Sequence, residues 1–387
     1  MPPPPQLDVP RGLESRLSAG HPWVYRDHVP PAFRAPAGTW VRVSAGRWSG
    51  FGLWHPDSPI AIRIFSSVAL PDPTWVRERV QAAWELRVAV RRDTDAFRLL
   101  FGESDGLPGI TVDVYGSFAV VVTYVEGLDQ VVRWVVEALV AALPLSGVVL
   151  RPRPSEGTTR LEVLWGRPPP DRLIVAERGL RFHVDVRRGQ KTGLFLDHRD
   201  NRRFIEECSD SKRVLNLFCY TGAFSLAAAR GGAREITQVD SAAEAVAAAR
   251  DNFELNGLCP DLHEFVTADV FEYMNSIEQR QFDLIVCDPP SFANNRRQLS
   301  RARRAYVRLN ALCLSRLAPG GWLATASCTA QLGPDDFRQV LGEAAVRAKR
   351  RLQVIHEAGQ PADHPVMTHH PEGRYLKFIV GRVLPVF

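Results

Sequence analysis

The feature that most constrains the fold of this chain is the regular alternation of strand and helix patterns after Arg187. Five short apolar runs are each followed by a helical pattern, at residues 214–219, 235–240, 263–269, 282–288 and 321–328. Alternation of this kind is typical of a parallel, doubly wound α/β sheet. Two further runs near the end have no helix between them, which predicts a reversed final strand.

The rest of the chain divides into two smaller parts. Residues 1–72 hold short runs rich in tryptophan and β-branched residues, broken by Gly and Pro, which is typical of a small β-barrel. Residues 73–186 combine strand patterns with helical ones, which predicts a mixed α+β middle domain. A chain of 387 residues suits two or three domains, and we expect three, with residues 187–387 as the last.

Composition excludes several classes of protein. Apolar residues make up 45% and charged residues 24% of the chain, and no apolar run is long enough to cross a bilayer. The start, MPPPPQLDVPRG, lacks the pattern of a secretory signal, so we expect a cytoplasmic protein. The six cysteines include no C-x-x-C pair. Neither a disulfide framework nor a metal site is therefore expected.

Acidic residues and a glycine follow four of the expected strands. Gly222 follows the first strand, and Asp240, Asp269 and Asp288 end the next three. In open parallel sheets, ligands bind beyond the carboxyl ends of the strands. One carboxylate can accept the ribose hydroxyls and another can reach an adenine edge, so an adenosyl group fits. Each carboxylate alone could instead cap a helix, and the absence of G-x-G-x-x-G makes a dinucleotide a weaker fit.

Several stretches together carry a resemblance to a known family. They are HPWVYRDHV, GESDGLPGITVDVYG, GQKTGLFLDHRDNR, LNLFCYTGAFS, DPPSF, SC, and ADHPV to EGRYLK. They resemble class I S-adenosylmethionine-dependent methyltransferases and, more closely, the ribosomal RNA large subunit methyltransferase I family, over almost the whole chain. The resemblance implies an RNA-binding PUA domain at the N-terminus and a Rossmann-like methyltransferase domain. It also implies S-adenosylmethionine as cofactor and methylation of carbon 5 of a cytosine in large-subunit ribosomal RNA.

The same resemblance implies which residues line the cofactor. They lie in GQKTGLFLDHR, in the turn after the first strand and at the strand ends: Lys191, Thr192, Asp197, Arg199, Phe218, Tyr220, Gly222, Asp240, Asp269 and Asp288. The alternative for GQKTGLFLDHR is an ordinary linker that closes over the sheet.

Methylation of carbon 5 requires a cysteine, because this carbon is a poor nucleophile until a thiolate adds to carbon 6. Cys328 ends the fifth strand among small polar residues, next in strand order to the DPPSF turn. We predict that Cys328 is the nucleophile. Cys287 lies inside the apolar run LIVC and Cys219 lies beside the cofactor glycine, so we expect both to be inert and buried.

A second catalytic residue is predicted in the DPPSF turn. Asp288 can bind the edge of the cytosine ring or assist removal of the carbon 5 proton, although it could simply begin the turn. Two-cysteine relatives carry a second cysteine after an Asp-x-Pro turn, and Ser291 stands at that place here. Either one cysteine suffices or another group assists its release.

Arginines gather directly after this turn. Between Ser291 and Arg308 there are six and no acidic residue: Arg296, Arg297, Arg301, Arg303, Arg304 and Arg308. Phosphate contacts that hold a flipped nucleotide would account for the cluster, although a run of charge is commonly a solvated face. Basic and aromatic residues of the N-terminal barrel would extend this surface, namely Arg16, Trp23, Tyr25 and Arg26.

Two other functions stay open at this point. The first is methylation of a base nitrogen in RNA, which needs no cysteine nucleophile, so Cys328 discriminates against it. The second is an inactive RNA-binding assembly factor, against which the cofactor carboxylates argue. The sequence does not distinguish a monomer from a homodimer, and it does not name the target nucleotide.

Overall fold

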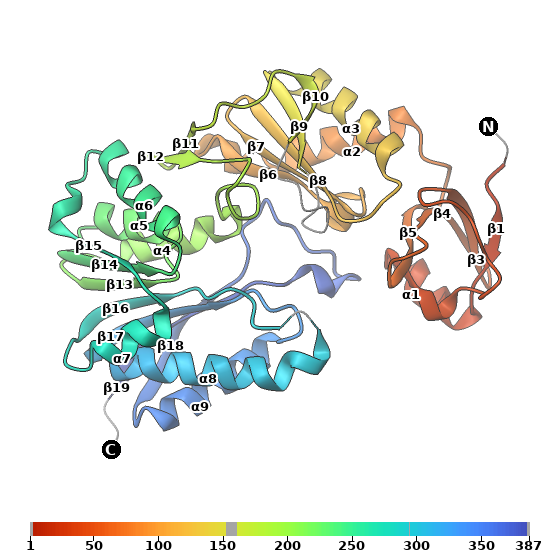
Figure 1. Ribbon diagram of the computed structural model, residues 1–387. Coiled ribbons are helices and arrows are strands. Elements are labelled where there is room, and N and C mark those ends of the chain that lie inside the picture. The colour runs from red at the N-terminus through yellow and green to blue at the C-terminus, as the bar shows by residue number, and fades with distance from the viewer. Residues whose placement is uncertain (1–2, 152–160, 294, 385–387) are drawn as a thin grey trace. The chain divides into compact units, whose positions relative to one another are not determined.

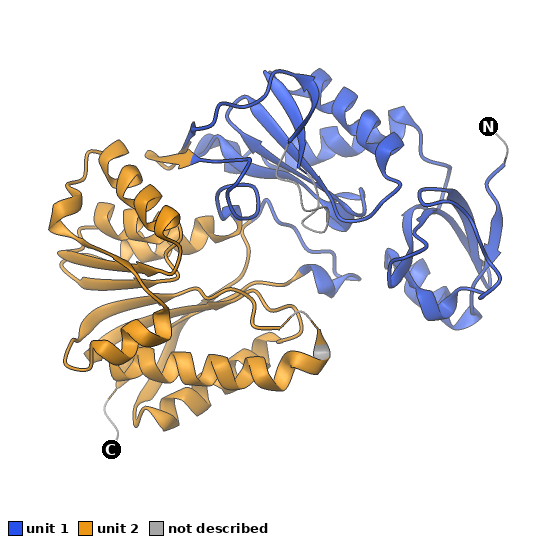
Figure 2. Ribbon diagram, viewed as in Figure 1, with its two compact units in different colours: residues 1–175, 184–196, 362–373 blue, residues 176–183, 197–361, 374–387 orange. Residues whose placement is uncertain are grey.

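The computed structural model describes residues 3–151, 161–293 and 295–384 (Figure 1). The chain forms two compact units (Figure 2). The first comprises residues 1–175, 184–196 and 362–373, and the second comprises residues 176–183, 197–361 and 374–387. Two segments distant in sequence, 184–196 and 362–373, therefore pack with the N-terminal half of the chain.

The first unit begins with a five-stranded sheet in the order β1-β3-β4-β5-β2. Its apolar positions alternate toward one core that includes Val24, Val41 and Ile62, as expected for strands with one buried face. The short helices η1 (Arg11–Leu13), α1 (Glu14–Ser18) and η2 (Arg26–His28) interrupt it. The strands are β1 (Gln6–Asp8), β2 (Trp23–Tyr25), β3 (Trp40–Ala45), β4 (Trp48–Trp54) and β5 (Ile60–Ser66).

A second five-stranded sheet follows in the same unit, in the order β10-β9-β8-β7-β6. Helices α2 (Pro73–Leu86) and α3 (Asp129–Ala142) pack against it, and Asp72 caps α2 by accepting the Trp75 N–H at 2.8 Å. The strands are β6 (Ala96–Phe101), β7 (Ile110–Tyr115), β8 (Phe118–Thr123), β9 (Gly147–Arg151) and β10 (Glu162–Gly166). The strands β11 (Leu173–Glu177) and β12 (Leu180–Val184) form a two-stranded sheet by themselves.

The second unit contains a seven-stranded sheet in the order β15-β14-β13-β16-β17-β19-β18. Every neighbouring pair is parallel except the two that involve β19, which runs antiparallel to β17 and to β18. The strands are β13 (Arg213–Leu217), β14 (Glu235–Asp240), β15 (Glu264–Thr267), β16 (Phe282–Cys287), β17 (Leu317–Ser327), β18 (Arg351–Ala358) and β19 (Lys377–Leu384). The expected doubly wound sheet with a reversed final strand is confirmed.

Helices cover both faces of this sheet. Figure 1 shows α4, α5 and α6 over one face and α7, α8 and α9 over the other. The central strands β13 and β16 are consequently buried on both sides, which explains their continuous apolar runs. The helices are α4 (Arg199–Glu207), α5 (Ala223–Arg230), α6 (Ala243–Leu255), α7 (Val270–Ser276), α8 (Leu299–Ser315) and α9 (Pro334–Arg347). Among the described residues, no helix is long and apolar enough to cross a membrane.

Candidate functional site

The turn between β13 and α5 has an unusual backbone. Phe218, Tyr220 and Gly222 have φ angles of 58°, 47° and 77°, in the left-handed region that residues with a side chain rarely adopt. A Cβ atom at Gly222 would lie 2.8 Å from Oε1 of Gln238 and 2.9 Å from Cβ of Ala249. Glycine is therefore required at residue 222 both for its φ angle and for space. Strained backbone of this kind concentrates at ligand-binding sites.

Asp240 connects this turn to the end of β14. One carboxylate oxygen accepts the Tyr220 N–H at 2.9 Å, and the other accepts the Ala242 N–H at 3.0 Å. Asp240 is half-buried, and each of its oxygens has a further lone pair that can accept a ligand hydroxyl. The geometry suits a carboxylate that binds a ribose beyond the strand end.

Asp269 occupies the corresponding place after β15. Its Oδ1 accepts the N–H groups of Phe271 and Glu272 at 2.8 and 3.0 Å, so Asp269 is the N-cap of α7. The residue is exposed, and the neighbouring backbone can still meet an adenine edge. Gly222, Asp240 and Asp269 each follow one of the neighbouring strands β13, β14 and β15, and we call these three positions the strand-end cradle. A glycine and carboxylates at strand ends are the groups that we expect to meet an adenosyl cofactor.

Asp288, after β16, is held by a histidine that the sequence patterns did not single out. Nε2 of His198 lies 3.2 Å from Oδ2 of Asp288, and Nδ1 of the same ring lies 3.0 Å from Nδ2 of Asn201. His198 is buried, and its ring packs edge-on against Phe224. Because the ring is contacted on both nitrogens, it fixes the orientation of the Asp288 carboxylate. The sequence offered one indication of a role for His198. It lies in GLFLDHR between Asp197 and Arg199, which the family resemblance implies as cofactor contacts.

Those two neighbours, Asp197 and Arg199, are both buried in the second unit. Asp197 accepts a hydrogen bond from the Tyr375 hydroxyl at 2.6 Å. Nε of Arg199 lies 3.8 Å from a carboxylate oxygen of Glu177. Both side chains therefore take part in ion pairs or hydrogen bonds inside this unit.

Thr192 is part of a buried network in the first unit. Its hydroxyl donates to Asp113 at 2.6 Å and lies 2.7 Å from the Tyr115 hydroxyl, whose pKa is raised by burial and by the Asp113 charge. Two hydrogen bonds from Arg98, at 2.8 and 2.9 Å, complete the neutralisation of Asp113. Lys191 is exposed, with its Nζ 4.4 Å from the centre of the Phe195 ring. Lys191 and Thr192 belong to the first unit, whereas the other expected cofactor contacts belong to the second.

Cys328 lies immediately after β17 and is half-buried. The next residue, Thr329, joins this strand end to the DPPSF turn, because its hydroxyl lies 3.1 Å from the Ser291 hydroxyl and 2.9 Å from the Tyr306 hydroxyl. Ser327 also donates to the Tyr306 hydroxyl, at 3.1 Å. Burial raises the pKa of Tyr306 to about 12, so it stays a neutral hydrogen-bonding partner near pH 7. The segments that carry Cys328 and Asp288 are thus connected directly.

The other cysteines near the sheet have a different environment. Cys287 is fully buried, and burial together with a contact to Cys313 raises the pKa of its thiol. Cys219 is also buried, with its pKa raised by burial and by the Asp240 charge. A raised pKa disfavours the thiolate, which is the reactive form. These two thiols are poor candidates for nucleophiles, as the sequence suggested.

Four of the six arginines share one side of a helix. Arg297 lies in η8 (Arg296–Gln298), and Arg301, Arg304 and Arg308 lie in α8, at a 4-3-4 spacing that places successive side chains on one face. All four are exposed, and we call them the arginine stripe. The Arg308 guanidinium lies 5.0 Å from the centre of the Phe271 ring.

Arg303 and Arg296 are not part of the arginine stripe. Arg303 points elsewhere and forms an ion pair with Glu343 of α9 at 2.6 Å. The side chain of Arg296 lies outside the described part of the chain.

The barrel residues that we expected to extend this surface have partners inside the first unit. Arg26 donates to the Ser58 carbonyl at 3.1 Å and lies over the Trp54 ring. The indole of Trp23 donates to Glu103 at 2.9 Å. The Arg16 guanidinium lies 5.5 Å from the centre of the Tyr25 ring.

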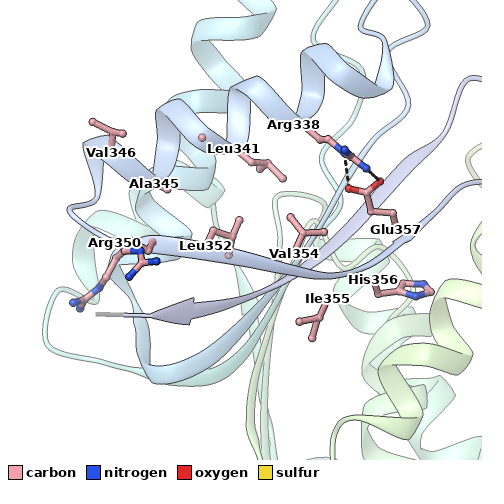
Figure 3. Close-up of a pocket in the computed structure, with 12 residues that line it drawn as sticks. Arg338, Leu341, Ala345, Val346, Arg350, Leu352, Val354, Ile355, His356 and Glu357 are labelled. Atoms are coloured by element: carbon pink, nitrogen blue, oxygen red, sulfur yellow. Dashed lines mark hydrogen bonds and ion pairs between the residues drawn. The ribbon is translucent and has the colours of Figure 1, made fainter. Parts of the chain in front are cut away.

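A hollow of about 750 Å³ opens elsewhere in the second unit, between α9 and the edge strand β18 (Figure 3). Its lining is mainly apolar, with an ion pair between Arg338 and Glu357 at one side. It contains none of the strand-end carboxylates and no cysteine. The hollow therefore offers none of the groups on which the expected chemistry depends. Among the described residues, no cluster of His, Cys, Asp or Glu is arranged to hold a metal ion.

Comparison with known proteins identifies two parts of the chain. The sequence profile described as a PUA-like domain matches residues 8–67, and the profile described as S-adenosylmethionine-dependent methyltransferase matches residues 132–376.

Two relatives carry the name ribosomal RNA large subunit methyltransferase I. The protein from Erwinia tasmaniensis is 38% identical, over 98% of this chain and 99% of its own length. The protein from Shewanella denitrificans is 39% identical, over 96% of this chain and 98% of its own length.

A solved structure is also similar over nearly the full length. The crystal structure of SMU.776 in complex with SAH has a TM-score of 0.88 and 26% identity, and the match covers 98% of this chain and all of that one. That protein binds the product form of the cofactor that the strand-end cradle fits.

Proposed function

Because the chain belongs to the ribosomal RNA large subunit methyltransferase I family, we propose that it methylates carbon 5 of a cytosine in large-subunit ribosomal RNA. Its cofactor is S-adenosylmethionine, which supplies the methyl group. The observation that carries the proposal is the position of Cys328, half-buried at the end of β17 and joined through Thr329 to the turn that holds Asp288.

The proposed reaction has three steps: addition of the cysteine, transfer of the methyl group, and elimination of the cysteine. The Cys328 thiolate adds to carbon 6 of the cytosine, and the electron pair of the carbon 5–carbon 6 double bond moves to carbon 5. This pair forms the bond from carbon 5 to the methyl group, while the bond between the methyl group and the sulfonium sulfur breaks and S-adenosylhomocysteine leaves. A base removes the proton from carbon 5. The electrons of that C–H bond restore the double bond and expel the cysteine thiolate. The product is 5-methylcytosine, and the cysteine is regenerated.

Asp288 has a defined part in this proposal. Its carboxylate, oriented by His198, accepts a hydrogen bond from the edge of the cytosine or receives the carbon 5 proton. A hydrogen bond between the Ser291 and Thr329 hydroxyls joins the turn that holds Asp288 to the segment after Cys328. A fixed acceptor of this kind positions the ring for attack at carbon 6.

The arginine stripe provides the proposed contact with RNA phosphates. Its side chains are exposed and follow the DPPSF turn directly, so they can hold the backbone on either side of a base that leaves the stack. We leave Arg303 out of the proposed contact because its guanidinium forms an ion pair with Glu343. The proposed footprint thus consists of Arg297, Arg301, Arg304 and Arg308.

The test uses ribosomal RNA that contains 5-fluorocytidine. Fluorine replaces the proton that must leave carbon 5, so methyl transfer should proceed and the enzyme should stay covalently attached. We expect a stable protein–RNA adduct with the native chain, and neither adduct nor methylation with Cys328→Ala. Cys287→Ala is the matched control and should still form the adduct. Full methylation by Cys328→Ala would refute the cysteine mechanism and favour methylation of a base nitrogen.

A further inference from the structure

Lys377, the first residue of β19, is a buried cation beside the proposed nucleophile. It pairs with Ser327 across β17 and β19, so it stands opposite the residue that precedes Cys328. Its Nζ donates to the carbonyl of Thr329, the residue that follows Cys328, at 2.7 Å. The lysine therefore contacts the backbone on both sides of the cysteine.

The ammonium group is buried with few compensating charges. Only 4% of Lys377 is exposed, and a buried charge is costly unless it is paired. Its hydrogen bonds among the described residues go to two neutral carbonyls, those of Thr329 at 2.7 Å and Tyr375 at 2.8 Å. An ammonium has three N–H donors, so one remains for an anion at the strand end.

The charges near this strand end also favour an anion beside Lys377. Burial and, to a smaller degree, the charge of Arg374 lower the pKa of Lys377 to about 8, while Cys328 acts in the opposite direction. A lysine with this pKa is still about 90% protonated at pH 7. Two other groups act near the site: burial keeps the Tyr306 hydroxyl neutral, and the charges of Cys328 and Asp288 raise the pKa of this hydroxyl further. Because Cys328 raises the pKa of Lys377, the charged lysine in turn favours the thiolate form of Cys328.

We propose that Lys377 is a positioning residue whose buried ammonium holds Cys328 in the thiolate form required for attack on carbon 6. The inference rests on the proposed function, because it assigns Lys377 a part in that reaction. The lysine does not touch the base itself. It acts through Cys328, and its two carbonyl contacts fix the ammonium at the strand end.

The test measures thiolate formation without the reaction. The full chain is alkylated with iodoacetamide from pH 5 to 10, and peptide mass spectrometry follows the rate at Cys328. In Lys377→Gln, which can still donate hydrogen bonds but carries no charge, the pH of half-maximal rate should rise by about one unit or more. Alkylation at pH 7 should then be about tenfold slower. An unchanged midpoint in folded Lys377→Gln would overturn the proposal.

Two controls separate charge from folding. Lys377→Arg keeps the charge and should restore a midpoint close to that of the native chain. Lys212→Gln removes another lysine that lies beside a cysteine, since its Nζ donates to the Cys208 carbonyl at 2.5 Å, and it should leave Cys328 unchanged. The native chain also gives a test that needs no variant, with exposed Cys259 as the internal reference in the same alkylation experiment. A Cys328 midpoint at or above that of Cys259 would contradict the proposal.

Methyl transfer gives an independent readout. Lys377→Gln should lower kcat about tenfold at pH 7, leave KM for RNA and for S-adenosylmethionine unchanged, and recover as the pH rises. A purely structural role would lower the melting temperature without recovery at high pH. Failure of the proposed function can be distinguished from failure of this proposal. Full methylation by Cys328→Ala would show that Cys328 is not the nucleophile, whatever the alkylation midpoint is.

Discussion

Replacing Asp240 with alanine tests the cofactor cradle directly. Both carboxylate oxygens already accept a backbone N–H, from Tyr220 at 2.9 Å and from Ala242 at 3.0 Å. These bonds fix the carboxylate at the end of β14 and support the Tyr220 backbone, which has a φ of 47°. The substitution therefore removes the proposed ribose acceptor and loosens the turn that lies beside it.

The expected magnitude follows from the charged hydrogen bonds that are lost. Hydrogen bonds to a charged group contribute about 1.5–3 kcal/mol, so S-adenosylmethionine should bind the Asp240→Ala variant roughly 10- to 150-fold more weakly. The free energy of unfolding should also fall, by about 1 kcal/mol or more, because two backbone donors lose their acceptor. Isothermal calorimetry on the full chain measures the first quantity, and urea unfolding measures the second.

Asp283 offers a matched control at the opposite ends of the strands. Its carboxylate accepts the Arg213 backbone N–H at 2.9 Å and the Arg213 side chain at 3.2 Å, where β13 and β16 begin. Asp283→Ala should therefore cost stability while leaving cofactor affinity unchanged. Equal affinity of the native chain and Asp240→Ala would refute the placement of the ribose, and equal losses in both variants would indicate a general loss of folding.

Two further predictions concern the arginine stripe and the buried thiol. Replacing Arg297, Arg301 and Arg304 with serine should weaken RNA binding and reduce the slope of log K against log salt by about 2, whereas Arg303→Ser should leave that slope unchanged. Filter binding at several salt concentrations measures both. Cys287→Ala should keep methylation activity while the free energy of unfolding falls by about 1 kcal/mol or more, as measured with urea, because a fully buried side chain is truncated.

The strand-end residues could be predicted from sequence because parallel strands place their carboxyl ends along one edge. The positions of Gly222, Asp240 and Asp288 after β13, β14 and β16 agree with the sequence pattern, and the reversed final strand followed from the missing helix. The contact of His198 with Asp288 could not be predicted. It depends on a segment before β13 packing near the end of β16, and local patterns carry no information on such a contact.

The arginine cluster carries a signal in its spacing as well as in its charge. Helical periodicity alone places Arg303 on a different side of the helix from Arg297, Arg301, Arg304 and Arg308. The acceptor Glu343 lies on the next helix, so its ion pair with Arg303 required the packing of α8 on α9. The number of arginines in the sequence alone therefore does not show which guanidinium groups already have an acidic partner.

The reversed strand β19 has a consequence for the chemistry as well as for the topology. Because it runs antiparallel to β17, its first residue, Lys377, pairs with the last residue of β17, Ser327. A parallel strand in the same place would bring its carboxyl end to this edge, after a crossover connection. The antiparallel direction instead lets the chain enter the sheet at the edge where Cys328 lies. The position of the lysine at this strand end thus follows from the sheet topology together with the register of β19 on β17, and the register could not be read from the sequence pattern.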